Sequence, residues 1–198
     1  VAKITNASLS SVFYESFEDI VLYDRWNSSG SGNKDLTHNN SWTGNNCLKF
    51  SGTTTAWSGV SSKDLLNVTP GKTYVLSCWY KALPGKYAFV NLYDASNNKS
   101  HTLMKEGSGE WEYLELKVTA SEADPNPCTV VRIYLYGHES SGADLYYDDI
   151  RFYPEESQME TFTYKPGIGI TSHSDANSIP TFYVYDGLGR LSKVRDHE

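Results

Sequence analysis

Apolar and polar residues alternate along five stretches in the middle of the chain. The stretches are Thr73–Ala82, Tyr87–Asp94, Trp111–Thr119, Thr129–Gly137 and Asp144–Tyr153. Alternation with a period of two places successive side chains on opposite faces of a β-strand. The Pro70-Gly71 pair, just before the first stretch, marks a turn between two strands. This pattern predicts an all-β fold, specifically an antiparallel β-sandwich.

The alternation also predicts which side chains face the core. Leu76 and Cys78 are core positions in the first stretch, and Ile133 and Leu135 are core positions in the fourth. The residues between such core positions then face outward, and we expect them to share one sheet face. The outward residues are Trp79, Asn91, Tyr93, Arg132, Tyr134 and Tyr136.

The last of the five stretches changes parity. Tyr147 and Ile150 both have the character of core residues, but they are three positions apart. In a regular strand, two residues on the same face are an even number of positions apart. One extra residue must therefore lie between them, so we predict a β-bulge at Asp148 and Asp149. A bulge of this kind can aim a carboxylate at a site.

Composition supports a β-rich fold and excludes some classes of partner. The chain has 15 Tyr, 5 Trp, 7 Phe and 15 Gly but only 2 Met, which favours short strands and turns. Its net charge is −7 and its Lys and Arg residues are dispersed, so we expect no nucleic-acid ligand and no anionic membrane surface. It has no long apolar run, so we expect no membrane insertion. Cys47, Cys78 and Cys128 lack metal-ligand spacing and indicate no disulfide framework.

Several motifs in the body of the chain occur together in a known order. They are Ser16-Phe-Glu18, Gly44–Phe50, Trp57, Thr69–Ser77 with Trp79, Trp111 and Tyr147-Asp-Asp-Ile-Arg-Phe152. With these motifs, the region from Phe17 to Tyr153 resembles the carbohydrate-binding module family of galactose-binding-like jelly rolls. The resemblance implies two antiparallel sheets packed face to face. Function does not follow from the fold, which serves binding and structural roles alike.

The last seventeen residues resemble one unit of the YD-repeat (Rhs) family. Two alternating stretches flank Gly187-Leu188-Gly189, a pattern typical of a β-hairpin. A degenerate copy, Tyr164–Asp175, precedes this unit at an offset of 21 residues. We interpret the C-terminal part as the first hairpins of a longer repeat array. The predicted division is 1–12 as a linker or loose first strand, 13–154 as the jelly roll, and 155–198 as the start of the YD-repeat hairpins.

Glu18 and Asp148 are the candidate metal ligands. In modules of the family that the chain resembles, the first strand and the bulged last strand meet at one edge of the sandwich. A hard cation there would take oxygen atoms from both carboxylates and from carbonyls near 43–46, which fits a structural calcium ion. The alternative is that these carboxylates are solvated or accept hydrogen bonds from backbone amides.

The outward-facing aromatic and polar residues are candidates for binding a glycan. A sugar-binding surface needs flat aromatic rings and a few polar side chains. Trp57 or Trp42, projecting from a loop, could form one side of such a surface. The alternative is that the long Asn27–Asn46 loop covers the same rings and turns them into a second small core. The predicted ligand-binding residues are Trp79, Tyr134, Tyr136, Arg132, Asn91, Tyr93 and Trp57.

Catalysis has little support in the sequence. Glu110 and Glu112 flank Trp111 and share a parity, but two carboxylates on a strand are usually solvated. The five His residues are scattered, and no Ser or Cys has the motif of a nucleophile.

We therefore expect a non-catalytic carbohydrate-binding module of a secreted or cell-surface YD-repeat protein. We interpret the start at Val1, without a signal peptide, as a piece of such a protein rather than as a cytoplasmic one. The alternative is a structural cap or spacer domain of a repeat shell with no sugar ligand. We also expect a weak homodimer through the C-terminal hairpins, with Tyr164, Tyr183 and Tyr185 on its buried side.

Overall fold

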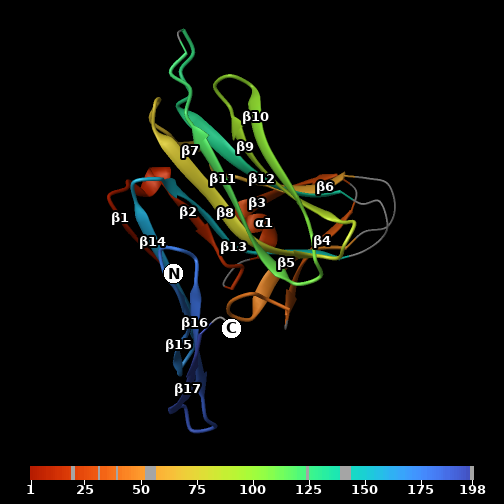
Figure 1. The fold of residues 1–198 in the computed structure, drawn as a ribbon, viewed down its shortest axis with the longest axis vertical. Coiled ribbons are helices and arrows are strands. Elements are labelled where there is room, and N and C mark those ends of the chain that lie inside the picture. Colours follow the sequence, from red (N-terminus) through yellow and green to blue (C-terminus); the bar gives the residue numbers. More distant parts are fainter. Residues whose placement is uncertain are drawn as a thin grey trace.

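Strands make up nearly all the regular structure of the chain (Figure 1). The computed structural model describes residues 1–18, 21–30, 32–38, 40–51, 57–123, 125–138 and 144–196, with the side chains of Trp57 and His138 outside the description. All strand pairings in these ranges are antiparallel. The predicted all-β antiparallel β-sandwich is confirmed.

One layer of the sandwich is a sheet that we call the β12 sheet after its central strand. Its strand order is β10 (Lys99–Glu106), β9 (Tyr87–Asp94), β12 (Val130–His138), β6 (Trp57–Ser62) and β3 (Trp26–Gly30), and the short β7 (Leu66–Asn67) pairs with the beginning of β12. A single helical turn, α1 (Leu22–Arg25), precedes β3.

The second layer is the β13 sheet. Its strand order is β11 (Trp111–Thr119), β8 (Thr73–Ala82), β13 (Leu145–Pro154), β5 (Asn46–Ser51) and β4 (Asn33–His38), and β2 (Phe13–Glu15) pairs with the end of β13. The predicted turn before β8 is present, since Lys72 N donates to Thr69 O at 3.1 Å. Gly71 has φ +80°, a conformation that this turn requires and that glycine adopts without strain.

A third sheet, which we call the C-terminal sheet, extends away from the sandwich (Figure 1). Its strand order is β1 (Ala2–Thr5), β14 (Gln158–Lys165), β15 (Gly169–Ser174), β16 (Pro180–Tyr185) and β17 (Leu191–Arg195). The predicted hairpin around Gly187–Gly189 joins β16 to β17, and Asp186 N donates to Arg190 O at 2.9 Å across it. A 3₁₀ turn, η1 (Leu9–Ser11), follows β1.

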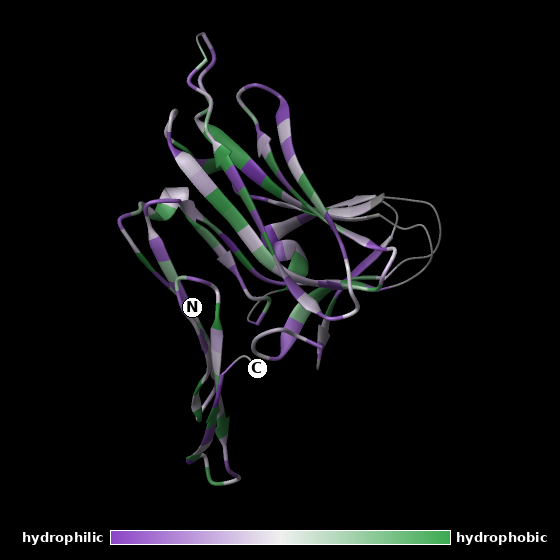
Figure 2. Ribbon diagram, in the orientation of Figure 1, coloured by the Kyte–Doolittle hydropathy of each residue, from purple (hydrophilic) through white to green (hydrophobic). Residues whose placement is uncertain are grey.

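The main core lies between the β12 and β13 sheets. The predicted inward residues Leu76, Cys78, Ile133 and Leu135 are all fully buried there, which confirms the assignment of faces. Hydrophobic and hydrophilic residues alternate along the strands of both sheets, as Figure 2 shows. The three cysteines are buried and unpaired.

One buried side chain connects the two sheets through hydrogen bonds as well as packing. Tyr147, on β13, is completely buried, and its hydroxyl donates to Tyr136 O on β12 at 2.6 Å. The same hydroxyl accepts from Phe89 N on β9 at 2.7 Å. The polar end of this tyrosine is therefore satisfied inside an apolar core.

The predicted β-bulge is confirmed. The register between β13 and β8 shifts between Asp148 and Arg151, and Asp149 has φ +54°, which is uncommon for a residue with a Cβ atom. Tyr147 and Ile150 consequently both face the core, while Asp148 and Arg151 both face outward, opposite Trp79 and Ser77.

The bulge also connects the sandwich to the C-terminal sheet. Arg151 and Asp149 form an ion pair of 3.0 Å, and both side chains are at most 1% exposed. Arg151 further donates to Asp175 O at 3.0 Å and to Thr161 Oγ1 at 2.6 Å, both in the C-terminal part of the chain. A small second core of Val75, Tyr153 and Met159 lies beside this pair. The outer face of the β13 sheet is therefore partly an interior surface.

The first residues differ from a free linker. Ala2–Thr5 forms β1, an edge strand of the C-terminal sheet that pairs with β14 over four residues. The segment is thus a strand, but of the C-terminal sheet rather than of the sandwich. No helix within the described part of the chain is long and apolar enough to cross a membrane.

We predict that Arg151→Met lowers the free energy of unfolding by about 3–5 kcal/mol, because it leaves Asp149 as a buried charge without its partner. Urea denaturation measures the change. Lys3→Met is the matched control, since it breaks the exposed Lys3–Glu160 pair at 3.7 Å and should cost less than about 1 kcal/mol. Adding Asp149→Asn to Arg151→Met should restore part of the loss. Equal losses for Arg151→Met and Lys3→Met would contradict the prediction.

Candidate functional site

The outer face of the β12 sheet carries most of the predicted ligand-binding residues. Neighbouring positions on β9 and β12 pair across this face: Asn91 lies opposite Tyr134, and Tyr93 lies opposite Arg132. Tyr136 follows on β12 with the same parity. The structure therefore brings these five residues together on one face, as the alternation predicted.

The three tyrosine rings on this face contact one another. The Tyr134 and Tyr136 rings are nearly parallel, with centroids 5.6 Å apart and planes 14° apart. The Tyr93 ring meets Tyr134 edge-on at 6.0 Å. Burial raises the pKa of Tyr136 to about 12, so its hydroxyl stays protonated at neutral pH and can donate a hydrogen bond.

A glycine on the neighbouring strand makes room for this aromatic surface. A Cβ atom added at Gly59, on β6, would lie 2.3 Å from Cδ1 of the Tyr136 ring. The ring therefore lies directly against the β6 backbone, and any side chain at Gly59 would displace it. The alternation of apolar and polar residues does not identify Gly59, because glycine has no side chain that is either apolar or polar.

Polar atoms on this face lack partners. Asn91 Nδ2 donates to Thr102 Oγ1 on β10 at 2.7 Å, but Asn91 Oδ1 is buried with no donor among the described residues. Arg132 Nε is likewise buried without an acceptor in the described part of the chain. An unpaired buried polar group costs roughly 1–3 kcal/mol. The face thus contains one acceptor and one donor without a described partner, but both atoms are buried, so a polar ligand reaches them only if the side chains over them move.

Trp79 does not belong to this surface, contrary to the prediction. It lies on β8 in the other sheet, with Asp148 and Tyr113 as its cross-strand partners, so it faces the opposite side of the sandwich. The period-two pattern separates inward from outward positions but does not say which sheet a strand joins. The prediction that all six residues share one face was wrong for this residue.

A loop covers Trp79. The Trp42 ring stacks on it with centroids 3.9 Å apart and planes 21° apart, and Trp79 is only 9% exposed. Phe182 of the C-terminal sheet contacts Trp42 edge-on at 6.4 Å. The alternative, in which a loop turns outward aromatics into a second small core, therefore holds on this side of the sandwich. The covering loop is only the β4–β5 connection, however, because the segment Asn27–Asn46 that we expected to be one long loop contains most of β3 and all of β4. Trp57 begins β6, but its side chain lies outside the described residues.

The candidate metal ligands Glu18 and Asp148 both face the loop 42–46. Glu18 Oε1 accepts from the amides of Asn45 and Asn46 at 2.8 and 2.7 Å. Asp148 Oδ2 accepts from the amides of Trp42 and Thr43 at 2.9 and 3.0 Å. Burial and the neighbouring Asp149 carboxylate raise the pKa of Asp148 well above its usual range, although the hydrogen bond from the Thr43 amide lowers it. Both carboxylates fix the loop that carries Trp42.

The same loop offers mixed support for a cation. Thr43 Oγ1 and Asn46 Oδ1 are buried without a described hydrogen-bond partner, and hard cations bind such oxygens. However, amide hydrogens rather than carbonyl oxygens point at the two carboxylates. The described residues contain no group of three His, Cys, Asp or Glu side chains that could hold a metal ion.

The two glutamates beside Trp111 lie in different surroundings. Glu112 accepts a hydrogen bond from the Tyr80 hydroxyl and lies 3.9 Å from Lys105 Nζ. Glu110 is exposed in the turn before β11. The two carboxylates thus have separate surroundings.

Comparison with known proteins adds a family and a fold. Residues 9–141 match the family described as "Carbohydrate binding domain". The C-terminal family 22 carbohydrate binding module of Clostridium thermocellum Xyn10B is similar in structure, with a TM-score of 0.54, 18% identity, and coverage of 76% of this chain and 98% of that one. The CBM22-1 xylan-binding domain of Paenibacillus barcinonensis Xyn10C has a TM-score of 0.53 and 16% identity, and covers 72% of this chain and 92% of that one. The search of curated proteins finds no match. At these identities the structural likeness shows the fold.

We predict that Trp79→Ala lowers the free energy of unfolding by about 3–5 kcal/mol, because it removes a buried ring and its stack with Trp42. Urea denaturation measures the loss. Met104→Ala is the control, since Met104 is 52% exposed on β10 and its truncation should cost about 0.5 kcal/mol or less. A Trp79→Ala variant as stable as the wild type would show that the Trp42 ring does not cover it in solution.

Proposed function

Because the chain belongs to the carbohydrate binding domain family, we propose that the outer face of its β12 sheet binds a neutral polysaccharide and performs no chemistry on it. The observation that carries the proposal is the combination of three contacting tyrosine rings with two unpaired buried polar atoms on one face.

The chemistry of a sugar ring matches this combination. A pyranose has C–H patches that pack on flat aromatic rings and hydroxyl groups around its edge. The nearly parallel rings of Tyr134 and Tyr136 offer contacts to adjoining sugar residues. A sugar hydroxyl that displaces the side chains over Asn91 Oδ1 or Arg132 Nε could pair with these buried atoms, which would relieve the cost of leaving them unpaired.

The structural relatives suggest the first polysaccharide to test. Two modules of the same fold are described as a xylan-binding domain and as a family 22 module studied for ligand binding in its cleft. Xylan is therefore the first probe, although low identity does not transfer a ligand.

The context of the module is a further part of the proposal. We propose that it belongs to a secreted or cell-surface protein and precedes a YD-repeat array. Two successive hairpins, β14–β15 and β16–β17, support the array, since they repeat one unit side by side in the C-terminal sheet. The role of structural cap remains the alternative, favoured by the buried contact between that sheet and Arg151.

We predict that Tyr134→Ala weakens retardation of the protein in native gels containing soluble xylan by about tenfold, because a stacking surface is lost. Asn91→Ala should weaken it by a smaller factor through one lost hydrogen bond. Tyr183→Ala, a partly exposed tyrosine of the C-terminal sheet, is the control and should leave retardation unchanged. If Tyr134→Ala is retarded as strongly as the wild type, then the outer face of the β12 sheet with Tyr93, Tyr134 and Tyr136, which we call the tyrosine face, is not the xylan site. If the wild type is not retarded, xylan is not the ligand.

We also propose a structural calcium ion at Glu18 and Asp148, which Thr43 Oγ1 and Asn46 Oδ1 support as buried oxygens. Millimolar calcium should then raise the melting temperature of the chelated protein by several degrees, because an ion bound only to the native state stabilises it. Glu18→Ala should abolish this response, while Glu160→Ala, at a partly exposed acidic residue of the C-terminal sheet, should keep it. Identical wild-type melting curves in chelator and in calcium would contradict the ion and leave the two carboxylates as acceptors for the loop amides.

A further inference from the structure

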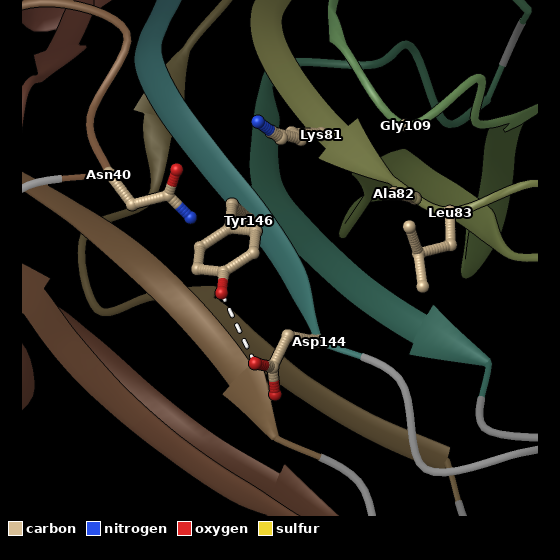
Figure 3. A pocket seen from close by; sticks show the side chains of 7 residues that line it. All are labelled: Asn40, Lys81, Ala82, Leu83, Gly109, Asp144 and Tyr146. Carbon is tan, nitrogen blue, oxygen red and sulfur yellow. Dashed lines mark hydrogen bonds between the residues drawn. The ribbon is translucent and has the colours of Figure 1, made fainter.

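A cavity of about 250 Å³ lies on the opposite side of the sandwich from the tyrosine face, because its strands belong to the β13 sheet. Figure 3 shows the residues that line it. It is formed where β8 ends and β13 begins, with one residue from the β4–β5 loop and one from the β10–β11 turn. Its lining residues are Asn40, Lys81, Ala82, Leu83, Gly109, Asp144 and Tyr146. Lys81 and Tyr146 are cross-strand partners on the outer face of the β13 sheet, so their side chains share one side.

The one carboxylate in the cavity wall is already neutralised. Asp144 Oδ2 lies 2.8 Å from Lys49 Nζ and accepts a hydrogen bond from the Tyr146 hydroxyl at 3.1 Å. Figure 3 shows this hydrogen bond and the Asn40 side chain pointing toward the Tyr146 ring. The wall thus holds an aromatic ring fixed at its hydroxyl end and an amide beside it.

Lys81 places a positive charge in the cavity, and no acidic residue in the described part of the chain balances it. Its ammonium group forms no ion pair with any acidic residue in the described part of the chain, whereas Lys49, Lys72 and Lys117 each form at least one. The side chain is only partly exposed. An anionic group entering the cavity would therefore find one unused cation at close range.

The remaining wall is apolar and the cavity is small. Ala82 and Leu83 line one side, and the Trp111 ring lies 6.5 Å from the Tyr146 ring at the edge of the same surface. Pockets for drug-sized ligands have roughly 300–1,000 Å³. A cavity of about 250 Å³ therefore suits a single sugar residue rather than a polysaccharide segment.

We propose that this cavity is a second glycan site that binds a uronic acid residue. The sugar carboxylate pairs with the Lys81 ammonium, a C–H face of the ring packs against Tyr146, and Asn40 hydrogen-bonds a hydroxyl group. The site is independent of the tyrosine face, because the two lie on outer faces of different sheets. A chain with both sites would recognise a neutral backbone on one side and an acidic residue on the other.

Titration calorimetry of the whole chain with trigalacturonic acid tests the proposal. Lys81→Gln should weaken binding at least tenfold, and Lys81→Arg should retain most of it. Lys63→Gln is the matched control, because Lys63 is an exposed lysine after β6 in the other sheet, so its loss lowers the net charge equally without touching the cavity. The fully methyl-esterified trisaccharide should bind no more tightly than Lys81→Gln binds the acid.

The outcomes separate this site from the tyrosine face. Tyr134→Ala should leave trigalacturonate binding unchanged, and Lys81→Gln should leave xylan retardation unchanged. Equal affinity of Lys81→Gln and wild type for trigalacturonate, or no binding by the wild type, would overturn the second site. Loss of trigalacturonate binding in Tyr134→Ala would assign the acid to the tyrosine face and also overturn it. Lys81→Gln should melt with the wild type, since Lys81 makes no described ion pair.

Discussion

The β-bulge on β13 is the feature on which the rest of the structure depends. A single extra residue, Asp149 at φ +54°, lets Tyr147 and Ile150 face the core from both sides of it. Tyr147 then reaches across to the backbone of the β12 sheet, while Arg151 turns outward to the C-terminal sheet. Asp148, also outward, holds the loop that carries Trp42. One strand therefore contacts the opposite sheet, the β4–β5 loop and the C-terminal sheet. A strand without the bulge would lose one of these contacts, because its side chains would alternate strictly between the two faces.

The bulge also explains why the two outer faces of the sandwich differ. On the β13 sheet, outward residues are covered by Trp42, by Met159 and by the C-terminal sheet, which the bulge contacts hold in place. On the β12 sheet, Tyr93, Tyr134 and Tyr136 are partly exposed, and Asn91 Oδ1 and Arg132 Nε have no described partner. This difference agrees with the ligand-binding role that we propose for the β12 face, and the uncovered end of the β13 face is limited to a cavity of about 250 Å³.

A period of two predicts which strand residues face inward and which face outward, but it does not predict which sheet a strand joins. Inward and outward positions and the parity change at Asp148 follow from local alternation, so they were predicted correctly. Membership of a sheet depends on pairings between distant residues, such as Tyr134 with Ser61, and no local pattern reports them; Trp79 was misplaced for this reason. The cavity beside Lys81 was missed because Asn40 and Gly109 come from connections that have no periodicity.

The edges of the C-terminal sheet bear on how it can be extended. Lys193 and Arg195 lie on β17, whose residues are all exposed, and Lys3 lies on β1 at the opposite edge. Basic residues on an edge strand oppose pairing with a like-charged copy. A homodimer formed by joining two β17 edges would place these charges against each other. Tyr164, which we expect on the buried side of a homodimer, is 45% exposed in the single chain. A strand that does pair with β17 should therefore carry acidic side chains opposite Lys193 and Arg195, each pair worth roughly 0.2–1 kcal/mol.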